Sequence, residues 1–145
     1  MVDGLLGKYR KMRFDKTILV IGFGSIGKRH VKNILEQTNS EIIIFTKRKN
    51  IVNNEIQKIS RNKNRIKISN NLKNCLTHDP KIAFITNETS LHIDFAIKLA
   101  KLGISLFIEK PLSNSIQKIN YLEKICQKKK IQSMIGCNLR FYPPI

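Results

Sequence analysis

The sequence predicts an α/β fold, a doubly wound parallel sheet of about six strands with helices on both faces. After residue 16, short apolar runs alternate with stretches whose apolar residues recur at three- and four-residue steps, as expected of strands followed by amphipathic helices. The first apolar run leads directly into a glycine-rich turn, IGFGSIG, at residues 21–27. A strand, a glycine turn and a helix in this order are typical of the first unit of such a sheet.

The predicted elements follow from these runs in chain order. We expect strands at about residues 17–21, 41–45, 66–68, 81–85, 105–108 and 131–135. We expect helices at about residues 26–37, 50–60, 71–76, 90–102 and 115–129. Gly103 follows the fourth helix as a C-terminal cap, and Ile116, Ile119, Leu122 and Ile125 give the fifth its helical spacing. In a sheet of this kind the ligand lies at the carboxyl ends of the strands.

The length of 145 residues predicts about one globular domain, which we expect at residues 17–137 after an N-terminal extension of residues 1–16. No apolar run approaches the roughly 20 residues of a membrane span, and no secretory signal is recognised, so we expect a cytoplasmic protein without membrane contact. The three cysteines are widely spaced, without a CxxC pair. We therefore expect free thiols and no metal site.

The chain is strongly basic, with 27 Lys and Arg residues against 10 Asp and Glu residues and a net charge of +17. Such a charge is common in nucleic-acid-binding proteins. The lysines are spread through every segment, however, and the clusters at 47–49 and 128–130 are not interleaved with the aromatic residues of a base-stacking surface. We expect no nucleic-acid partner, although the charge favours anionic ligands.

The glycine turn has two interpretations, a phosphate-binding loop or a plain tight turn. As a phosphate-binding loop, Gly22 allows the sharp exit from the strand, Gly24 lets the backbone approach a pyrophosphate, and Gly27 lets the helix lie close to the strand. Ser25 and Ile26 complete the turn at the start of the helix. The unpaired N–H groups at a helix N-terminus favour an anion there, so we favour the phosphate-binding loop.

The residues after the second predicted strand predict the choice of cofactor. An NAD-selective site has a carboxylate there for the ribose hydroxyls, but this chain reads FTKRKN and has no Asp or Glu between Glu41 and Glu55. Thr46, Lys47 and Arg48 instead offer donors suited to a 2′-phosphate. We expect NADP, with NAD as the alternative cofactor. A solvated basic loop is the other interpretation of this segment.

Four motifs in order resemble the N-terminal half of the Gfo/Idh/MocA family of NAD(P)-dependent sugar oxidoreductases. They are GFGSIGKRH, TNETSLH, LFIEKPLS and GCNLRFYPP, and together they span roughly residues 17–144. The resemblance implies a Rossmann fold and hydride transfer between the cofactor and a sugar or nucleotide-sugar hydroxyl. The second domain of the family does not follow in this sequence, and residues 138–145 would be its start. We therefore expect a catalytically incomplete chain, either a fragment of a longer enzyme or one half of a split protein with a separate C-terminal half.

The resemblance also implies roles for single residues. Asn87, Thr89 and His92 would line the cofactor near the nicotinamide, although a helix-face histidine bonded locally is an equal interpretation of His92. Glu109 and Lys110 match the family's EK pair, whose lysine reaches both the nicotinamide ribose and the substrate. Lys110 is thus the candidate catalytic residue, since an ammonium group there can hydrogen-bond the substrate hydroxyl and help to move its proton.

One further residue and one further function complete these expectations. The resemblance implies that Arg140 closes the substrate side of the site. A non-catalytic module that binds a dinucleotide for sensing or assembly is the alternative to an oxidoreductase domain.

Overall fold

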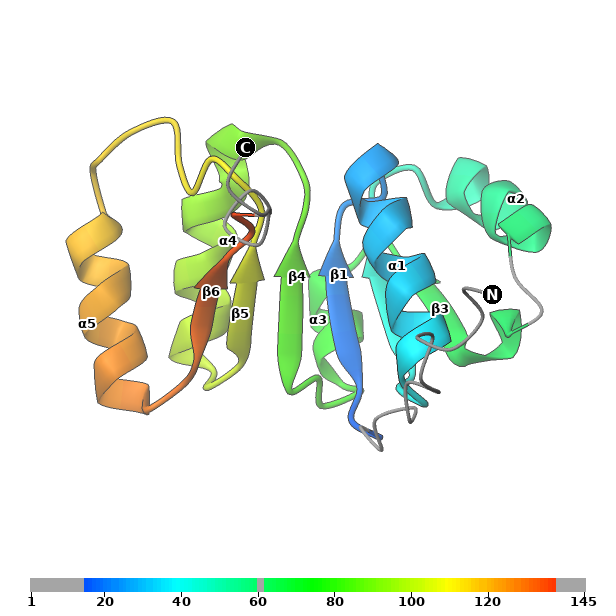
Figure 1. Cartoon of the computed structure of the whole chain (residues 1–145), viewed down its shortest axis with the longest axis horizontal. Coiled ribbons are helices and arrows are strands. Elements are labelled where there is room, and N and C mark those ends of the chain that lie inside the picture. The colour runs from blue at the N-terminus through cyan, green and yellow to red at the C-terminus, as the bar shows by residue number, and fades with distance from the viewer. Residues whose placement is uncertain (1–14, 60–61, 138–145) are drawn as a thin grey trace, which may run out of the picture.

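A single parallel sheet forms the centre of the molecule (Figure 1). The structure, a computed structural model, describes residues 15–59 and 62–137. The strands lie in the order β3-β2-β1-β4-β5-β6, and every neighbouring pair is parallel. They are β1 (Ile18–Ile21), β2 (Ile42–Phe45), β3 (Ile66–Ser69), β4 (Ile82–Ile85), β5 (Ser105–Ile108) and β6 (Ser133–Ile135). The predicted doubly wound fold is confirmed, and its strand order reverses between β1 and β4.

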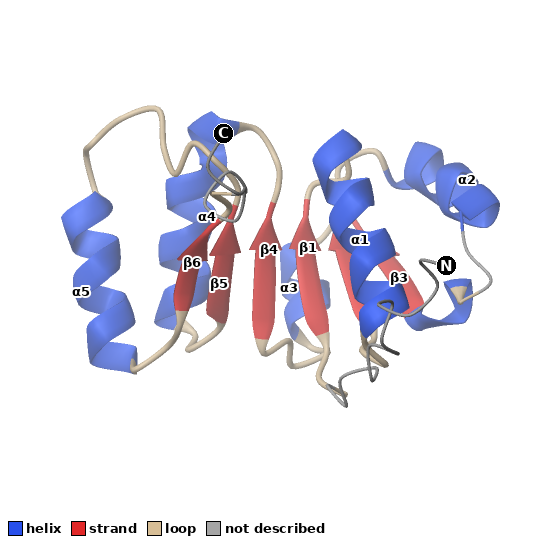
Figure 2. Cartoon of the chain, viewed as in Figure 1, coloured by secondary structure: helices blue, strands red, loops and turns tan. Residues whose placement is uncertain are grey.

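Helices cover both faces of this sheet (Figure 2). They are α1 (Ser25–Gln37), α2 (Lys49–Ile59), α3 (Leu72–Leu76), α4 (Thr89–Lys101) and α5 (Ile119–Lys129), with a 3₁₀ turn at Lys63–Arg65. Two buried clusters show which helices share a face. One joins α1 and α2 to one side of β1 and β2, and the other joins α3, α4 and α5 to the opposite side of the sheet.

Strand β1 contributes to both clusters. Ile18 and Val20 belong to the cluster under α1 and α2, whereas Leu19 and Ile21 belong to the cluster under α4. This follows from the two-residue period of a strand, and a strand buried on both faces is apolar throughout. All four side chains are at most 3% exposed, so the strand that leads into the glycine turn is rigidly held.

Arg65 secures the far end of α1. Its guanidinium group donates to the carbonyl oxygens of Leu35 at 2.7 Å, Thr38 at 2.9 Å and Ser40 at 3.3 Å. These carbonyls lie at or just beyond the C-terminus of the helix, where backbone acceptors lack intrahelical partners and a cation is favoured. One arginine therefore joins the end of α1 to the segment before β3.

The predicted start of the fifth helix is wrong, because α5 begins at Ile119 and not at residue 115. Lys118 has φ +66°, outside the helical region. Before it, the Ser115 N–H donates to Ser113 Oγ at 3.2 Å and the Gln117 N–H to Ser115 Oγ at 3.1 Å. Serine side chains that bond nearby backbone in this way compete with the helix, and Ile116 is left 89% exposed.

Several expectations concern residues outside this description or features of the whole chain. Residues 1–14 and 138–145, with Arg140, lie outside the described residues. Of the helices that are described, none is long and apolar enough to cross a membrane. Within 15–59 and 62–137, no cluster of three or more His, Cys, Asp or Glu residues has metal-binding geometry. Cys75, Cys126 and Cys137 are free thiols, and burial raises the pKa of Cys75 and Cys126.

Candidate functional site

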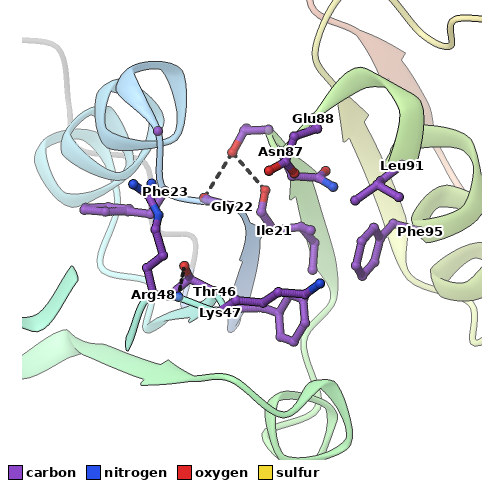
Figure 3. A pocket seen from close by; sticks show the side chains of 13 residues that line it. Ile21, Gly22, Phe23, Thr46, Lys47, Arg48, Asn87, Glu88, Leu91 and Phe95 are labelled. Atoms are coloured by element: carbon purple, nitrogen blue, oxygen red, sulfur yellow. Dashed lines mark hydrogen bonds between the residues drawn. The ribbon is translucent and has the colours of Figure 1, made fainter. Parts of the chain in front are cut away.

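A pocket of about 700 Å³ opens at the carboxyl ends of β1, β2 and β4 (Figure 3). This is the point where the strand order reverses, the usual ligand site of a doubly wound sheet. The lining residues come from the three segments that follow these strands and from the first turns of α4: Ile21–Gly24, Phe45–Arg48, Thr86–Glu88, Leu91 and Phe95.

The glycine turn is shaped by close contacts at two of its three glycines. Gly22 has φ +89°, and a Cβ there would lie 2.8 Å from the Asn87 Cα. A Cβ at Gly27 would lie 2.7 Å from the Gly22 carbonyl oxygen. Gly24 differs, since no described atom lies within 4 Å of the position of its Cβ. Gly22 and Gly27 are therefore required by packing, and Gly24 leaves an open surface on the pocket wall.

The first turn of α1 presents unpaired donors to this open surface. Gly24 is the N-cap residue of α1 and has no side chain to accept from the first N–H groups, and the first turn of α1 contains no acidic residue. The initial N–H groups of a helix have no intrahelical acceptor, and the dipole favours an anion beside them. This end of α1 can therefore hold a phosphate group.

Two polar residues after β4 face the glycine turn. Thr86 is buried, and its hydroxyl lies 3.0 Å from the carbonyl oxygen of Ile21 and 3.2 Å from that of Gly22 (dashed lines, Figure 3). Asn87 Oδ1 is buried and finds no hydrogen-bond partner among the described residues. Buried polar atoms are nearly always satisfied, so an unsatisfied oxygen in a pocket wall fits a ligand that supplies a donor.

The basic segment after β2 forms the opposite side of the pocket from Asn87 and Glu88 (Figure 3). Thr46 is only 6% exposed, and its hydroxyl accepts the Arg48 N–H at 3.2 Å. That bond uses a lone pair, so the hydroxyl proton remains able to donate to a ligand. Lys47 and Arg48 are exposed and line the same pocket. This wall therefore combines a hydroxyl with two cations.

Some of the residues predicted to form the site line the pocket, and the other described candidates lie outside its lining. Gly22, Gly24, Thr46, Lys47, Arg48 and Asn87 line the pocket. The remaining described candidates are Ser25, Ile26 and Gly27 in α1, Thr89 and His92 in α4, and Glu109 and Lys110 after β5, all outside its lining. His92 is 1% exposed, and its ring lies between two backbone carbonyl groups, that of Asn87 nearby in the sequence and that of Pro111, 19 positions away.

Sequence analysis missed the apolar side chains of the pocket and one histidine. Phe23, Phe45, Leu91 and Phe95 line the pocket. The four-residue spacing of Leu91 and Phe95 after TNETS is the signal that points to them. His30 contacts Glu109 across 79 positions of sequence, a pairing that no local pattern reveals.

A model of the "Oxidoreductase family, NAD-binding Rossmann fold" matches residues 16–137. The chain belongs to the Gfo/Idh/MocA family. The polar groups of the pocket fit a dinucleotide: an uncapped helix N-terminus, an unsatisfied Asn87 oxygen and a basic wall.

Similar proteins in this family are longer than the chain. The uncharacterized oxidoreductase YrbE of Bacillus subtilis is 29% identical over 126 residues, which cover 86% of this chain and 36% of YrbE. The UDP-N-acetylglucosamine 3-dehydrogenase GnnA from Acidithiobacillus ferrooxidans has a TM-score of 0.75 at 18% identity, over 90% of this chain and 39% of GnnA.

A second similar structure contains ligands. The WlbA dehydrogenase from Chromobacterium violaceum, in complex with NADH and UDP-GlcNAcA, has a TM-score of 0.72 at 16% identity, over 88% of this chain and 36% of WlbA. The chain thus spans between 36% and 39% of the length of these three Gfo/Idh/MocA relatives.

The unsatisfied oxygen of Asn87 gives a test that separates binding from folding. We expect Asn87→Ala to change the free energy of unfolding by less than about 1 kcal/mol, because the variant removes a buried acceptor that lacks a partner. We expect the affinity for a dinucleotide to fall about tenfold, as for the loss of one hydrogen bond. Chemical denaturation and calorimetric titration measure the two effects.

Asn71 is the matched control for this test. Its Oδ1 accepts the N–H groups of Lys73 at 2.9 Å and Asn74 at 3.4 Å at the start of α3, so Asn71→Ala should cost about 1 kcal/mol of stability and leave the affinity unchanged. A loss of stability in Asn87→Ala with full affinity would contradict the assignment of Asn87 to the ligand.

Proposed function

We propose that this chain is the cofactor-binding domain of an oxidoreductase that transfers hydride between NADP and a hydroxyl group of a sugar or nucleotide sugar. The observation that carries the proposal is the pocket at the reversal of strand order, which has an open helix N-terminus on one wall and Thr46, Lys47 and Arg48 on another. The names of two relatives, a UDP-N-acetylglucosamine 3-dehydrogenase and a dehydrogenase in complex with NADH and UDP-GlcNAcA, support the substrate class.

Each wall has its own part in the proposed site. The N–H groups at the start of α1, with Ser25 and Ile26, receive the pyrophosphate over the open surface at Gly24. Thr46 and Arg48 donate to the 2′-phosphate, and Lys47 adds a point charge. Asn87 Oδ1 accepts from the nicotinamide side, with Thr89 nearby at the start of α4. When bound, the nicotinamide ring supplies the hydride chemistry.

Lys110 is the proposed catalytic residue. It is exposed and follows β5 at the same edge of the sheet. Its ammonium group donates a hydrogen bond to the substrate hydroxyl and helps to move the hydroxyl proton as hydride is transferred. Glu109 precedes it and holds the backbone of Lys110 through the Lys110 N–H, at 3.2 Å.

The domain organisation is also part of the proposal. Residues 17–137 form the cofactor-binding domain, and residues 138–145, with Arg140, begin the second domain that the longer relatives contain. That domain, in the same polypeptide or as a separate C-terminal half, completes the substrate wall. The share of the relatives that this chain spans, 36–39%, supports this division.

The choice of NADP over NAD is tested at Arg48. We expect the wild-type chain to bind NADP at least about tenfold more tightly than NAD, because hydrogen bonds to charged groups contribute roughly 1.5–3 kcal/mol each. Arg48→Ala should remove most of this difference by weakening NADP alone. Calorimetric titration of both cofactors at one moderate salt concentration measures it.

Arg29 provides the control for net charge. It is exposed on α1 and does not line the pocket, so Arg29→Ala removes the same charge without removing the guanidinium group from the pocket. Equal binding of NAD and NADP by the wild type, or an equal loss of both in Arg48→Ala, would show that the basic segment does not recognise the 2′-phosphate.

A further inference from the structure

The segment of residues 109–111 is held from both sides by imidazole rings of two different helices. His30, on α1, places its Nε2 2.6 Å from Glu109 Oε1. His92, on α4, places its Nδ1 3.0 Å from the Pro111 carbonyl oxygen. Lys110 lies between these two contacts and is itself exposed. Each neighbour of Lys110 is therefore fixed to a helix that begins at the cofactor pocket.

The contact on the Glu109 side is rigid. The His30 ring packs against Phe84 and Phe107, with ring centroids 5.2 Å and 5.0 Å away, and these two rings stack on each other at 4.9 Å. The His30 and Glu109 side chains are only 17% and 18% exposed. A Cβ at Gly136 would lie 3.2 Å from the carboxyl carbon of Glu109, so the segment after β6 packs against the other side of this carboxylate.

The carboxylate of Glu109 uses both of its oxygens. Oε1 meets His30, and Oε2 accepts the N–H of Lys110 at 3.2 Å. The side chain of Glu109 therefore connects the ring on α1 directly to the backbone of Lys110. A shift of α1 along its axis would move that backbone with it.

The contact on the Pro111 side reaches the other wall of the pocket. The Nε2 of His92 lies 2.9 Å from the Asn87 carbonyl oxygen, while its Nδ1 faces the Pro111 carbonyl. In a neutral ring one of the two nitrogens donates, and in a protonated ring both do. The His92 ring therefore lies between the segment after β4, which carries the unsatisfied Asn87 Oδ1, and the segment after β5, and it hydrogen-bonds one of the two carbonyls when neutral and both when protonated.

We propose that His30 and His92 are positioning residues. By fixing residues 109–111 to both walls of the pocket, they hold Lys110 against the bound cofactor. His30 fixes Glu109 to α1, the helix whose N-terminus is proposed to receive the pyrophosphate. His92 fixes Pro111 to the segment after β4 that contains Asn87. The inference rests on the proposed function, because it takes Lys110 to act beside a bound dinucleotide. Neither histidine lines the pocket, so both act through other residues.

The position of Lys110 can be measured without catalysis. In the 145-residue chain, Lys110 is acetylated with acetic anhydride in the presence and absence of saturating NADP, and the modified fraction is measured by mass spectrometry. In the wild type we expect NADP to slow acetylation of Lys110 severalfold. A merely structural role of the histidines would change the melting temperature but not this protection in a chain that still binds NADP.

Variants of matched size test each histidine. His30→Leu and His92→Leu keep apolar volume and remove the donors, whereas His30→Gln and His92→Gln retain an N–H donor. We expect each leucine variant to lose most of the protection of Lys110, and each glutamine variant to recover part of it. His30→Leu should weaken NADP binding by less than about threefold, because His30 is not in the pocket wall.

Two further variants complete the test. Glu109→Leu removes both acceptor oxygens with the His30 ring intact, so it replaces His30→Leu if that variant does not fold and should lose protection equally. In a double variant, His30→Leu with Glu109→Leu should lose no more than either alone, since the pair acts as one unit. His78→Leu is the control, as His78 follows α3 at the opposite edge of the sheet.

The outcomes separate the two proposals. If the wild type binds NADP and protects Lys110, but His30→Leu and His92→Leu protect it as well as His78→Leu does, the positioning role is overturned and the proposed function stands. If the wild type does not bind NADP, or binds it without protecting Lys110, the proposed function of Lys110 fails and the positioning role fails with it.

Discussion

Gly27→Leu is expected to destabilise the folded domain by about 3 kcal/mol or more and to remove cofactor binding with it. A Cβ at this position would lie 2.7 Å from the Gly22 carbonyl oxygen and 2.9 Å from Thr86 Oγ1. The first of these is a backbone atom and the second is held in hydrogen bonds to the same turn. Neither can move away without opening the junction of α1 with β1. Denaturant unfolding followed by circular dichroism measures the loss.

Gly24→Ala is the matched control for this prediction. No described atom lies within 4 Å of its Cβ position, and its φ of −80° suits any residue. We therefore expect its stability to stay within about 0.5 kcal/mol of the wild type, while the added methyl group weakens binding of a phosphate against the backbone. Unchanged melting of Gly27→Leu would contradict the close packing of α1 on β1. Unchanged affinity of Gly24→Ala would contradict the phosphate site.

The 145-residue chain is expected to bind NADP but to oxidise sugars and nucleotide sugars several powers of ten more slowly than a complete enzyme, because orientation of the two reactants contributes that much to a rate. The chain spans 36–39% of the relatives named above, and the proposed substrate wall belongs to the remainder. Formation of NADPH, followed by absorbance with a panel of UDP-sugars, measures turnover.

Lys110→Ala is the control that separates turnover by this chain from a contaminating activity. Robust dehydrogenation that disappears in Lys110→Ala would contradict the need for a second domain. If turnover remains absent after a C-terminal half of a relative is added, while NADP binds, the alternative of a non-catalytic dinucleotide-binding module is favoured.

Most of the fold could be predicted because its signals are local. Strand β1 is apolar at all four positions and ends at a glycine turn, and the predicted range of residues 17–21 differs from Ile18–Ile21 by one residue. The start of α5 could not be predicted in this way. The apolar spacing of Ile116 and Ile119 is helical, but Lys118 adopts φ +66° and the serines before it bond their own backbone. Spacing alone does not show which of these local preferences prevails.

The site was predictable where its residues follow strands, and not where it depends on contacts between helices. Thr46 directly follows one predicted strand and Asn87 is the second residue after another, and both line the pocket. The contact of His30 with Glu109 joins α1 to the end of β5, which requires the three-dimensional arrangement of the sheet. The burial of His92 likewise depends on the path of the chain at Pro111, which no periodic pattern specifies.

The two ends of α1 differ in how their free backbone groups are compensated, because Arg65 binds only the C-terminal end. Its guanidinium group compensates the C-terminal carbonyls within the fold, whereas the N-terminal turn has no side-chain cap and no acidic residue, so a bound anion would add to its compensation. A ligand that binds only the folded form stabilises it by about 2.7 kcal/mol at one hundred times its dissociation constant. Cellular proteases degrade chains that unfold, so a dinucleotide bound at this helix end would slow the degradation of the chain.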